Sequence, residues 1–221
     1  MRKRQSTPLS EPRSSISNTI CEEPFTLVNR LFKSVLREKV DCNMAILKIA
    51  RMGHPILTSK AMKVDDPTSS SVQRLASDML ETMIDAPGVG LAAPQVHVPL
   101  RVIAFRVPPV REDDNQSVPA TVIINPEINP LSDLEEEDIE GCLSIPQMVG
   151  MVPRYKKIRY QAYDLNGQKL EVDAEGYHAR IIQHECDHLD GILYPMRMRD
   201  LSKFGFSEEF SKIEDSHVDR N

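Results

Sequence analysis

Apolar residues recur at helical spacing between positions 72 and 84. They stand at i, i+3, i+4, i+7, i+8, i+11 and i+12, and they are Val72, Leu75, Ala76, Met79, Leu80, Met83 and Ile84. Because this spacing places them on one side of a helix, it predicts an amphipathic helix of about four turns. Ser69 to Ser71 are candidate N-terminal caps, and Pro87 with Gly88 is expected to end the helix.

Short β-rich runs with turn signals between them predict strands elsewhere. The expected strands are 45–50, 100–107 and 121–124. Asn125-Pro126 is expected to end the third of them. Segment 88–95 is expected to be a loop, and a functional loop and a simple turn are both open. It lacks the spacing of a phosphate-binding motif, so a phosphate site is not expected there. Between positions 133 and 140, six of eight residues are acidic, which favours a solvated loop over a site for a cation or a basic partner.

A hairpin is predicted around position 166. Asn166-Gly167 separates two alternating runs, 156–165 and 168–175, and this pattern is typical of a hairpin, usually with a type I′ turn. The second run leads into residues 179–189, whose apolar side chains are expected to be buried along one helix.

The composition indicates the kind of compartment and argues against some classes of partner. A chain of 221 residues suits one domain with an appendage. The net charge of −6 argues against a general nucleic-acid surface, and no apolar run approaches the ~20 residues that span a bilayer. The four cysteines form no CxxC pair and no secretory signal is visible, so a reducing compartment is expected.

Residues 1–43 differ from the rest of the chain. They begin rich in Arg, Ser and Pro, and apolar residues between 28 and 35 then recur at helical spacing. Such a segment is typical of a transit peptide, but the acids Glu22 and Glu23 argue against one. We interpret it as a dispensable or disordered extension, or as the result of a start placed too early, with Met44 as the true beginning.

Residues Gln183 to Gly191 read QHECDHLDG. His184 and His188 stand four residues apart, one above the other on a helix, and two imidazoles so placed can bind one metal ion. Glu185 is turned by about 100° from His184 and can reach a water on that metal. The alternative is a helix with two chance histidines.

A site with two histidines still needs a third ligand. The segment EGCLS, residues 140–144, makes Cys142 the leading candidate. Cys186 lies two residues from each histidine, roughly on the opposite side of the helix. We therefore expect Cys186 to pack in the core rather than bind metal.

Three separated motifs carry a resemblance to a known family. In chain order they are GVGLAAPQ (88–95), EGCLSIP (140–146) and QHECDHLDG (183–191). They resemble the signature motifs of peptide deformylases, and MAILKIARMGHP resembles the usual start of that family. The resemblance implies an α+β fold with antiparallel sheets around a central metal-binding helix. It predicts a catalytic domain over 44–206, after the extension 1–43 and before a polar tail, 207–221.

The resemblance also implies an activity. Peptide deformylases remove the formyl group from the N-terminal formyl-methionine of newly synthesised polypeptides and release formate. The metal would be Fe(II), often replaced by zinc, nickel or cobalt, with Cys142, His184 and His188 as ligands and a fourth position open for water. That water would attack the formyl carbon, and Glu185 would take its proton and return one to the leaving amine.

Further roles follow from the same resemblance. The oxyanion would accept hydrogen bonds from the side chain of Gln95 and the backbone N–H of Leu143. Gly90 would let the substrate approach closely. The candidates for lining the methionine pocket are Val89, Tyr177 and Ile181. The candidates for orienting the metal ligands are Glu140 and Arg154.

Two departures from the family pattern affect the expected partners. Related sequences often have an arginine where this chain has Val149, which puts a contact of that arginine with the peptide in doubt. Residues 207–221 are acidic, so docking on the ribosome through a basic C-terminal helix is not expected. The expected partners are formyl-methionyl nascent peptides, without membrane or direct nucleic-acid binding. The favoured location is the bacterial cytoplasm, or an organelle if residues 1–43 are a transit peptide.

Two other functions compete with deformylation. A metallopeptidase would use a downstream glutamate ligand, and Glu208 and Glu209 lie 20 and 21 residues past His188. That interpretation leaves EGCLS unexplained. A metal-stabilised binding module without catalysis is the second alternative.

Overall fold

The computed structural model describes residues 45–109 and 117–210. The predicted extension 1–43, together with Met44 and the residues 110–116 and 211–221, lies outside the described residues. Within the described ranges, none of the helices is long and apolar enough to cross a membrane.

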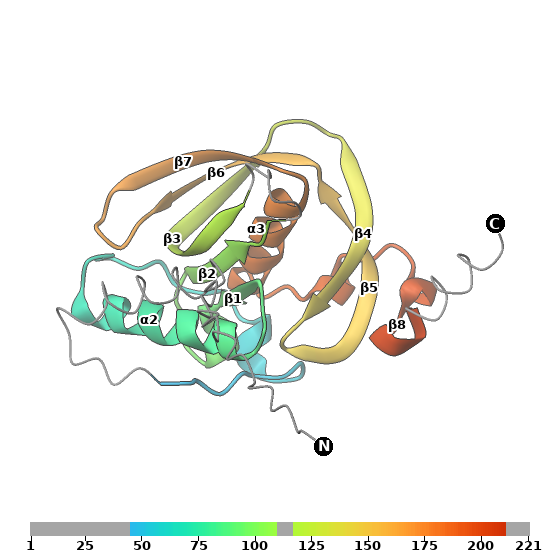
Figure 1. Ribbon diagram of the computed structural model, residues 1–221, viewed down its shortest axis with the longest axis horizontal. Coiled ribbons are helices and arrows are strands. Elements are labelled where there is room, and N and C mark those ends of the chain that lie inside the picture. The colour runs from blue at the N-terminus through green and yellow to red at the C-terminus, as the bar shows by residue number, and fades with distance from the viewer. Residues whose placement is uncertain (1–44, 110–116, 211–221) are drawn as a thin grey trace, which may run out of the picture. The chain divides into compact units, whose positions relative to one another are not determined.

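The strands of the described residues form two antiparallel sheets (Figure 1). The five-stranded sheet has the order β1-β2-β3-β6-β7, formed by β1 (Gly90–Ala92), β2 (Val102–Val107), β3 (Val118–Pro130), β6 (Lys157–Tyr163) and β7 (Lys169–Glu175). The three-stranded sheet has the order β4-β5-β8, formed by β4 (Glu135–Cys142), β5 (Ile145–Tyr155) and β8 (Phe204–Phe206).

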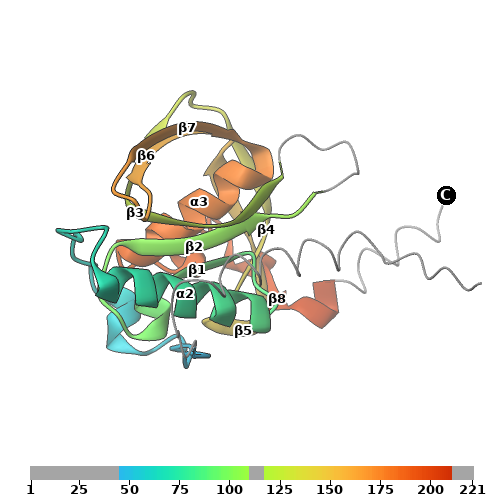
Figure 2. The same ribbon diagram turned by 60° about the vertical axis from the view of Figure 1, so that its left-hand side comes forward.

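Besides residues 207–210, which are also helical, the described residues contain two α-helices and four 3-10 turns. They are η1 (Pro55–Thr58), α2 (Ser70–Asp85), η2 (Ala93–Val96), α3 (Gly176–Leu189), η3 (Tyr194–Met196) and η4 (Leu201–Lys203). Helix α3 contacts strands of both sheets, and the five-stranded sheet curves around it (Figure 2). The predicted α+β architecture, with antiparallel sheets around a central helix, is confirmed.

Strand β2 shows how the five-stranded sheet separates two apolar layers. Successive side chains of a strand point to opposite faces. Val102 and Ala104 pack in the layer that includes helix α2, whereas Ile103 and Phe105 pack in the layer that includes α3. The helix predicted over 72–84 is confirmed, and its methionines are buried in the first of these layers.

Helix α3 follows the β6–β7 hairpin directly, and its C-terminal end is fixed by a glycine. Gly191 has a φ of +73°, the left-handed conformation expected just after a helix. A Cβ at Gly191 would lie 2.7 Å from the carbonyl carbon of Thr58. Glycine is therefore required at this position both by the turn and by the close approach of η1.

One predicted strand does not exist, and another extends further than predicted. Residues 45–50 are not a strand, because their backbone bonds to side chains and loops: Leu47 N–H donates to Thr82 Oγ1 and Ala50 N–H to the carbonyl of Gln95. The strand predicted over 121–124 instead runs through Asn125-Pro126. Asn125 takes a φ of 53° at an irregularity in the β3–β6 pairing, and a bulge of this kind tolerates proline.

The acidic segment 133–140 was wrongly predicted to be a loop, because its greater part is strand β4, although residues 133–139 are exposed as expected. This strand pairs with β5, from Glu135 opposite Tyr155 to Cys142 opposite Ile145, and forms one edge of its sheet. Charged side chains are common on such edges, where they prevent pairing with other chains.

The remaining differences concern turns. The segment 88–95 contains strand β1 and part of η2 instead of being a plain loop. The predicted hairpin exists, but its turn is not type I′, since Gly167 has a positive φ and Asn166 does not. Gly167 N–H donates to the carbonyl of Asp164, and Asp164 N–H donates to the carbonyl of Gln168, which is typical of a longer loop with glycine in the left-handed conformation.

Candidate metal centre and its cavity

Three predicted ligands meet at one point between the helix and the three-stranded sheet. The ligand atoms of Cys142, His184 and His188 all lie within 4.8 Å of one another. Cys142 Sγ is 3.3 Å from His188 Nε2, and both histidines are largely enclosed. One thiolate and two imidazoles within this distance fit a divalent ion such as zinc or iron, and they leave a fourth position open.

The sequence brings these ligands together through two local structures. His184 and His188 are one turn apart on α3, as the motif predicts. Cys142 ends strand β4, where the chain turns through Leu143 and Ser144 into β5. The position of the thiolate relative to the imidazoles therefore depends on how the β4–β5 hairpin is held against α3.

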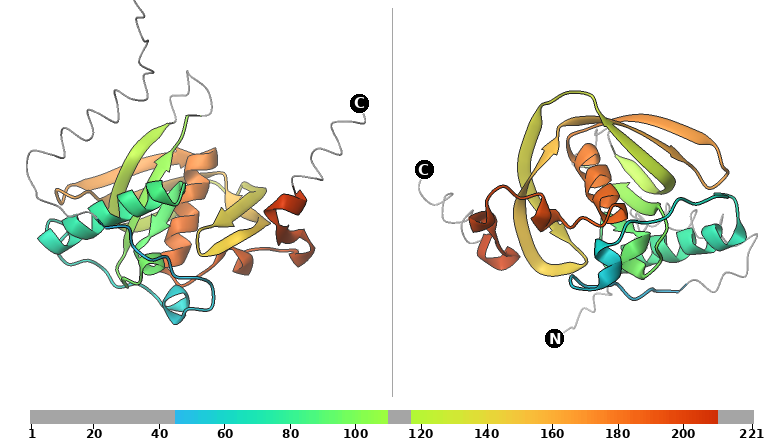
Figure 3. Two further views of the ribbon diagram at one scale, coloured as in Figure 1. Left: turned by 60° about the horizontal axis from the view of Figure 1, so that its bottom comes forward. Right: turned by 180° about the vertical axis from the view of Figure 1, so that it is seen from behind.

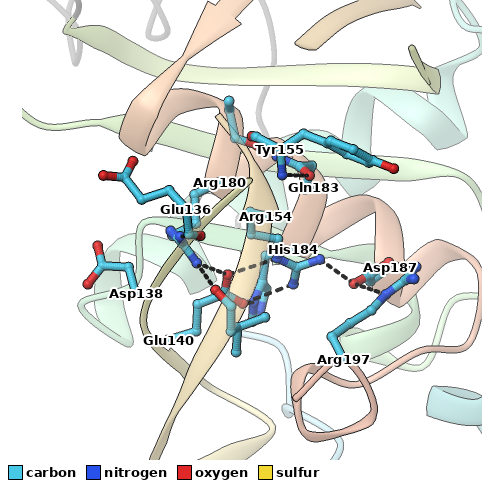
Figure 4. Close-up of polar contacts among 12 residues, drawn as sticks. Glu136, Asp138, Glu140, Arg154, Tyr155, Arg180, Gln183, His184, Asp187 and Arg197 are labelled. Carbon is cyan, nitrogen blue, oxygen red and sulfur yellow. Dashed lines mark hydrogen bonds and ion pairs between the residues drawn. The ribbon is translucent and has the colours of Figure 1, made fainter. Parts of the chain in front are cut away.

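Glu140 is the centre of a buried ionic network behind the ligands (Figure 4). Its carboxylate accepts hydrogen bonds from Arg154 at 2.8 and 2.9 Å, from Arg180 at 2.8 Å and from His184 Nδ1 at 2.8 Å. Burial alone would raise the pKa of Glu140, but the hydrogen bonds from Arg154 and His184 outweigh it and hold this pKa far below its usual range. Because Nδ1 of His184 is held by Glu140, the other ring nitrogen, Nε2, faces the side where the sulfur of Cys142 lies.

Arg154 extends the network to the far end of α3. It donates to Asp187 at 2.6 Å, and Asp187 also accepts two hydrogen bonds from Arg197. Arg154 and Asp187 are both buried. The predicted partners Glu140 and Arg154 are thus in contact with the site, one directly with His184 and the other through Glu140.

Glu185 points into the site with one oxygen atom unsatisfied. Its side chain is buried, and Oε2 has no hydrogen-bond partner. Burial raises the pKa of Glu185 to about 7, although a cation bound by the nearby ligands would favour the ionised form. A Cβ on Gly90 would lie 2.1 Å from Oε1 of Glu185, so the absence of a side chain at Gly90 makes room for this carboxylate.

The amide of Gln95 is fixed in one orientation. Its Oε1 accepts a hydrogen bond of 2.7 Å from the backbone of Ala92, and its Nε2 donates to Ser144 Oγ at 3.1 Å and lies 3.6 Å from Cys142 Sγ. The side-chain N–H₂ group of Gln95 therefore faces the ligand cysteine.

A cavity of about 470 Å³ opens beside these groups. It is lined by the predicted site residues Val89, Gly90, Gln95, Glu140, Cys142, Leu143, Tyr177, Ile181, His184 and Glu185. His188 and Arg154 are not part of its lining; they lie behind it. Val149, at the position where an arginine is common, also lines the cavity.

Some residues of the site could not be identified from the sequence. Arg180 is buried, donates to Glu140, and donates 2.8 and 2.7 Å bonds to the carbonyls of Val152 and Glu136. A signal did exist, since Arg180, His184 and Asp187 are spaced i, i+4 and i+7 on one side of α3. Charged side chains are mostly exposed, so this spacing alone does not indicate a buried side.

The competing ligands do not join the metal cluster. Among the described residues, the only group of histidine, cysteine and carboxylate side chains with metal-binding geometry is the one of Cys142, His184 and His188. Glu208 and Glu209 are described and are not in it. Cys186 is buried in the apolar layer beside α3, as predicted.

Comparison with known proteins gives one consistent result. A family model described as polypeptide deformylase matches residues 46–204. "Peptide deformylase 1" of Nitrosomonas europaea is 49% identical over 164 residues, which are 74% of this chain and 93% of that protein. "Peptide deformylase 1" of Bordetella pertussis is 49% identical over 174 residues, 77% of this chain and 98% of that protein.

Solved structures agree with the sequence relatives. A class I type b peptide deformylase from Acinetobacter baumannii with Met-Ala-Ser bound is 38% identical and superposes with a TM-score of 0.65, covering 70% of this chain and 99% of that one. The peptide deformylase of Ehrlichia chaffeensis in complex with actinonin is 31% identical, with a TM-score of 0.67, and covers 80% of this chain and 100% of that one.

Proposed function

The chain belongs to the polypeptide deformylase family, hydrolases that remove the formyl group from new polypeptides, and from this premise we propose how its side chains perform the reaction. The substrate is the formyl-methionine end of a nascent chain, and the products are formate and a free α-amine. The observation that carries the proposal is the unsatisfied oxygen of Glu185 beside the cluster of Cys142, His184 and His188.

We propose that Cys142, His184 and His188 hold one Fe(II) ion, for which zinc, nickel or cobalt can substitute. Imidazole ligands suit iron, zinc and nickel alike, so the donor set alone leaves these metals open. When bound, the ion supplies a water of lowered pKa and polarises the formyl oxygen. The elemental content of protein purified without oxygen tests this choice: iron at one atom per chain supports it, and zinc alone would contradict it.

Glu185 acts as general base and then general acid. Its carboxylate takes the proton of the attacking water and delivers it to the nitrogen that leaves the formyl carbon. A group with a pKa near the working pH serves both steps. The burial of Glu185 raises its pKa to about 7, near neutral pH, and a cation held by the three ligands would favour the ionised form that accepts the proton of the water.

Gln95 and Leu143 stabilise the oxyanion. The carboxamide of Gln95 is held by Ala92 and Ser144 with its N–H₂ group towards Cys142, where the formyl carbon is expected. The backbone N–H of Leu143 follows the ligand cysteine directly. Donors fixed before the reaction need no reorganisation as negative charge develops on the oxygen.

The cavity holds the first residue of the peptide. A relative was solved with Met-Ala-Ser bound, and we propose the same class of ligand here. Gly90, Val89, Tyr177 and Ile181 line the space next to Glu185 and are the proposed contacts for the methionine end. Ile181 is buried, whereas 45% of Tyr177 is exposed, so Ile181 lies on the deep side.

The decisive experiment separates catalysis from metal binding. Glu185→Ala should abolish deformylation of formyl-Met-Ala-Ser while the protein keeps one metal ion per chain. Cys142→Ser should lose metal as well as activity, whereas Cys186→Ala, a matched change at a buried cysteine away from the cavity, should keep both. Full turnover by the Glu185 variant would refute its role, and retained metal in the Cys142 variant would support the metallopeptidase alternative.

We further propose a catalytic domain over 44–206, with 1–43 a dispensable extension and 207–221 a polar tail. The family match over 46–204 supports the core of this division. The bacterial relatives support a cytoplasmic location, with an organelle as the alternative if 1–43 is a transit peptide. Expression from Met44 with unchanged kcat/KM would support the first boundary.

A further inference from the structure

The acidic strand β4 has its basic partners within this chain. Glu135 forms an ion pair with Arg199, and Glu137 forms one with Lys203 at 2.5 Å. Both basic residues belong to the segment 197–207, here called the C-terminal arm. Because alternate residues of a strand share a face, Glu135 and Glu137 present one charged row to this arm.

The C-terminal arm also pairs with strand β5. Strand β8 runs antiparallel to it, with Met148 opposite Phe206 and Gly150 opposite Phe204. A Cβ on Gly150 would lie 2.6 Å from the sulfur of Met198, so the arm packs closely against this strand. Figure 3 shows β8 beside the β4–β5 hairpin. The arm is thus held both by backbone pairing and by ion pairs.

The arm reaches the cavity of the metal centre. Ser207, directly after β8, lines that cavity, as do Met148 and Val149 of the neighbouring strand. The wall of the cavity therefore continues from β5 into the arm. On this wall Val149 offers no hydrogen-bonding side chain, whereas Ser207 offers a hydroxyl.

The cavity has a buried end and a solvent-exposed end, as the exposure of its lining residues shows. Glu185 and Gln95, at the reacting end, are buried, whereas Ser207 is exposed. A peptide whose formyl group reaches Glu185 must leave the cavity towards solvent. Ser207 therefore belongs to the solvent-exposed part of the cavity lining.

We propose that the C-terminal arm is part of the peptide-binding surface, with Ser207 contacting residues that follow the formyl-methionine and with the ion pairs to Glu135 and Glu137 holding it in place. The proposal rests on the proposed function, since it needs a formylated peptide in the cavity. It gives the acidic segment a role in positioning the arm, and it makes Ser207 a specificity-determining residue for longer substrates.

The test compares two substrates of different length, formyl-Met-Ala and formyl-Met-Ala-Ser-Ala-Ala. Ser207→Ala removes one hydrogen bond and should raise KM for the five-residue peptide by about 2- to 10-fold more than KM for the dipeptide, with kcat little changed. If wild-type enzyme hydrolysed neither peptide, the proposed function itself would fail. If it hydrolysed both and Ser207→Ala changed the two KM values equally, only the role of the arm would fail.

Charge exchange tests the ion pairs. Lys203→Glu places two like charges together and should raise KM for the longer peptide selectively, by about 2- to 5-fold, as expected for a surface pair. The exchange Lys203→Glu with Glu137→Lys should restore it. Lys63→Glu, at a more exposed ion pair with Glu127 that is away from the arm, is the control for the change of charge and should leave both KM values as in wild type. A double variant as impaired as the single one would overturn the proposed pairing.

Discussion

The two sides of α3 are held by different kinds of interaction. Towards the five-stranded sheet the helix buries Ala179, Ile182 and Leu189 in an apolar layer. Towards the three-stranded sheet it presents Arg180 and Asp187, together with His184, to buried charges of β4 and β5. The same helix is thus anchored by apolar packing on one side and by an ionic network on the other.

The two kinds of interaction differ in how precisely they fix the position of the helix. Apolar burial is strong but not directional, so it can fix the helix on the sheet without defining each distance. Hydrogen bonds to charged groups have defined lengths and angles. Because Glu140 lies two residues before Cys142 on β4 and binds His184 on α3, the ionic side sets the separation of the thiolate from the imidazoles.

Removal of Glu140 should have the largest effect. Glu140→Ala leaves Arg154 and Arg180 buried without their main partner, which typically costs about 3–5 kcal/mol of unfolding free energy. Loss of the bond to His184 should also weaken metal binding by about 10- to 100-fold. Denaturant unfolding and competition with a chelator measure the two quantities. An unchanged metal affinity would show that the network does not position the ligands.

A cavity on the apolar side should affect stability without affecting the metal. Ile182 is fully buried, and Ile182→Ala should lower the unfolding free energy by about 3 kcal/mol through lost packing. Metal affinity of the folded protein should stay within about twofold of wild type, since no ligand contact is removed. A drop in affinity as large as that of Glu140→Ala would remove the distinction between the two sides.

The apolar side of α3 is the side that the sequence predicts well. Ile182 and Leu189 stand at helical spacing, and QHECDHLDG marks the helix and two ligands without reference to any other element. The third ligand, Cys142, could be named only as a candidate, because two histidines need a further ligand, and the resemblance to a family then supported it. Nothing local to EGCLS indicates that it meets a helix more than forty residues later. Local patterns reveal what one element buries, but not which distant element it faces.

The strand formed by the acidic segment before Glu140 escaped prediction for the same physical reason, whereas Glu140 and Arg154 themselves were expected beside the ligands. Glu135 and Glu137 have low strand propensity and suggested a solvated loop, yet pairing with β5 and with basic residues of the C-terminal arm makes them a strand. Asn125 likewise suggested the end of a strand. Its side chain instead bonds both the N–H and the carbonyl of Val64, which supports a bulge that lets β3 continue.

Removal of Arg180, one member of the ionic network, should lower the unfolding free energy less than removal of Glu140 at its centre. Arg180→Met removes one of the two arginines on Glu140 but leaves Arg154 bound, so we expect a loss of about 1–3 kcal/mol, mainly from unsatisfied carbonyls of Val152 and Glu136. Arg159→Met, at a solvent-exposed pair with Asp173, is the control and should cost less than about 1 kcal/mol. Equal losses of unfolding free energy in the two variants would mean that the buried ion pairs of the network stabilise the protein no more than an exposed pair does.

The smallest expected effect is on the pH dependence of the unfolding free energy, and it comes from a histidine on the apolar side of α3. His178 is mostly buried between Phe105 and Tyr160, and burial lowers its pKa from the ordinary value of 6.5. Below about pH 6.5 the unfolded chain binds a proton at this histidine that the folded protein does not, so its contribution to stability is present above that pH and is lost as the pH falls towards the folded pKa. His178→Leu should therefore flatten the decline in unfolding free energy between pH 7.5 and 5.5, measured by denaturant titration with the metal-free protein. A decline as steep as in wild type would show that His178 does not carry the acid sensitivity and would place it at another buried histidine such as His188, whose pKa burial also lowers. Glu140 cannot cause a decline in this pH range, because a carboxylate whose pKa is held low loses its contribution only below its ordinary value of 4.5.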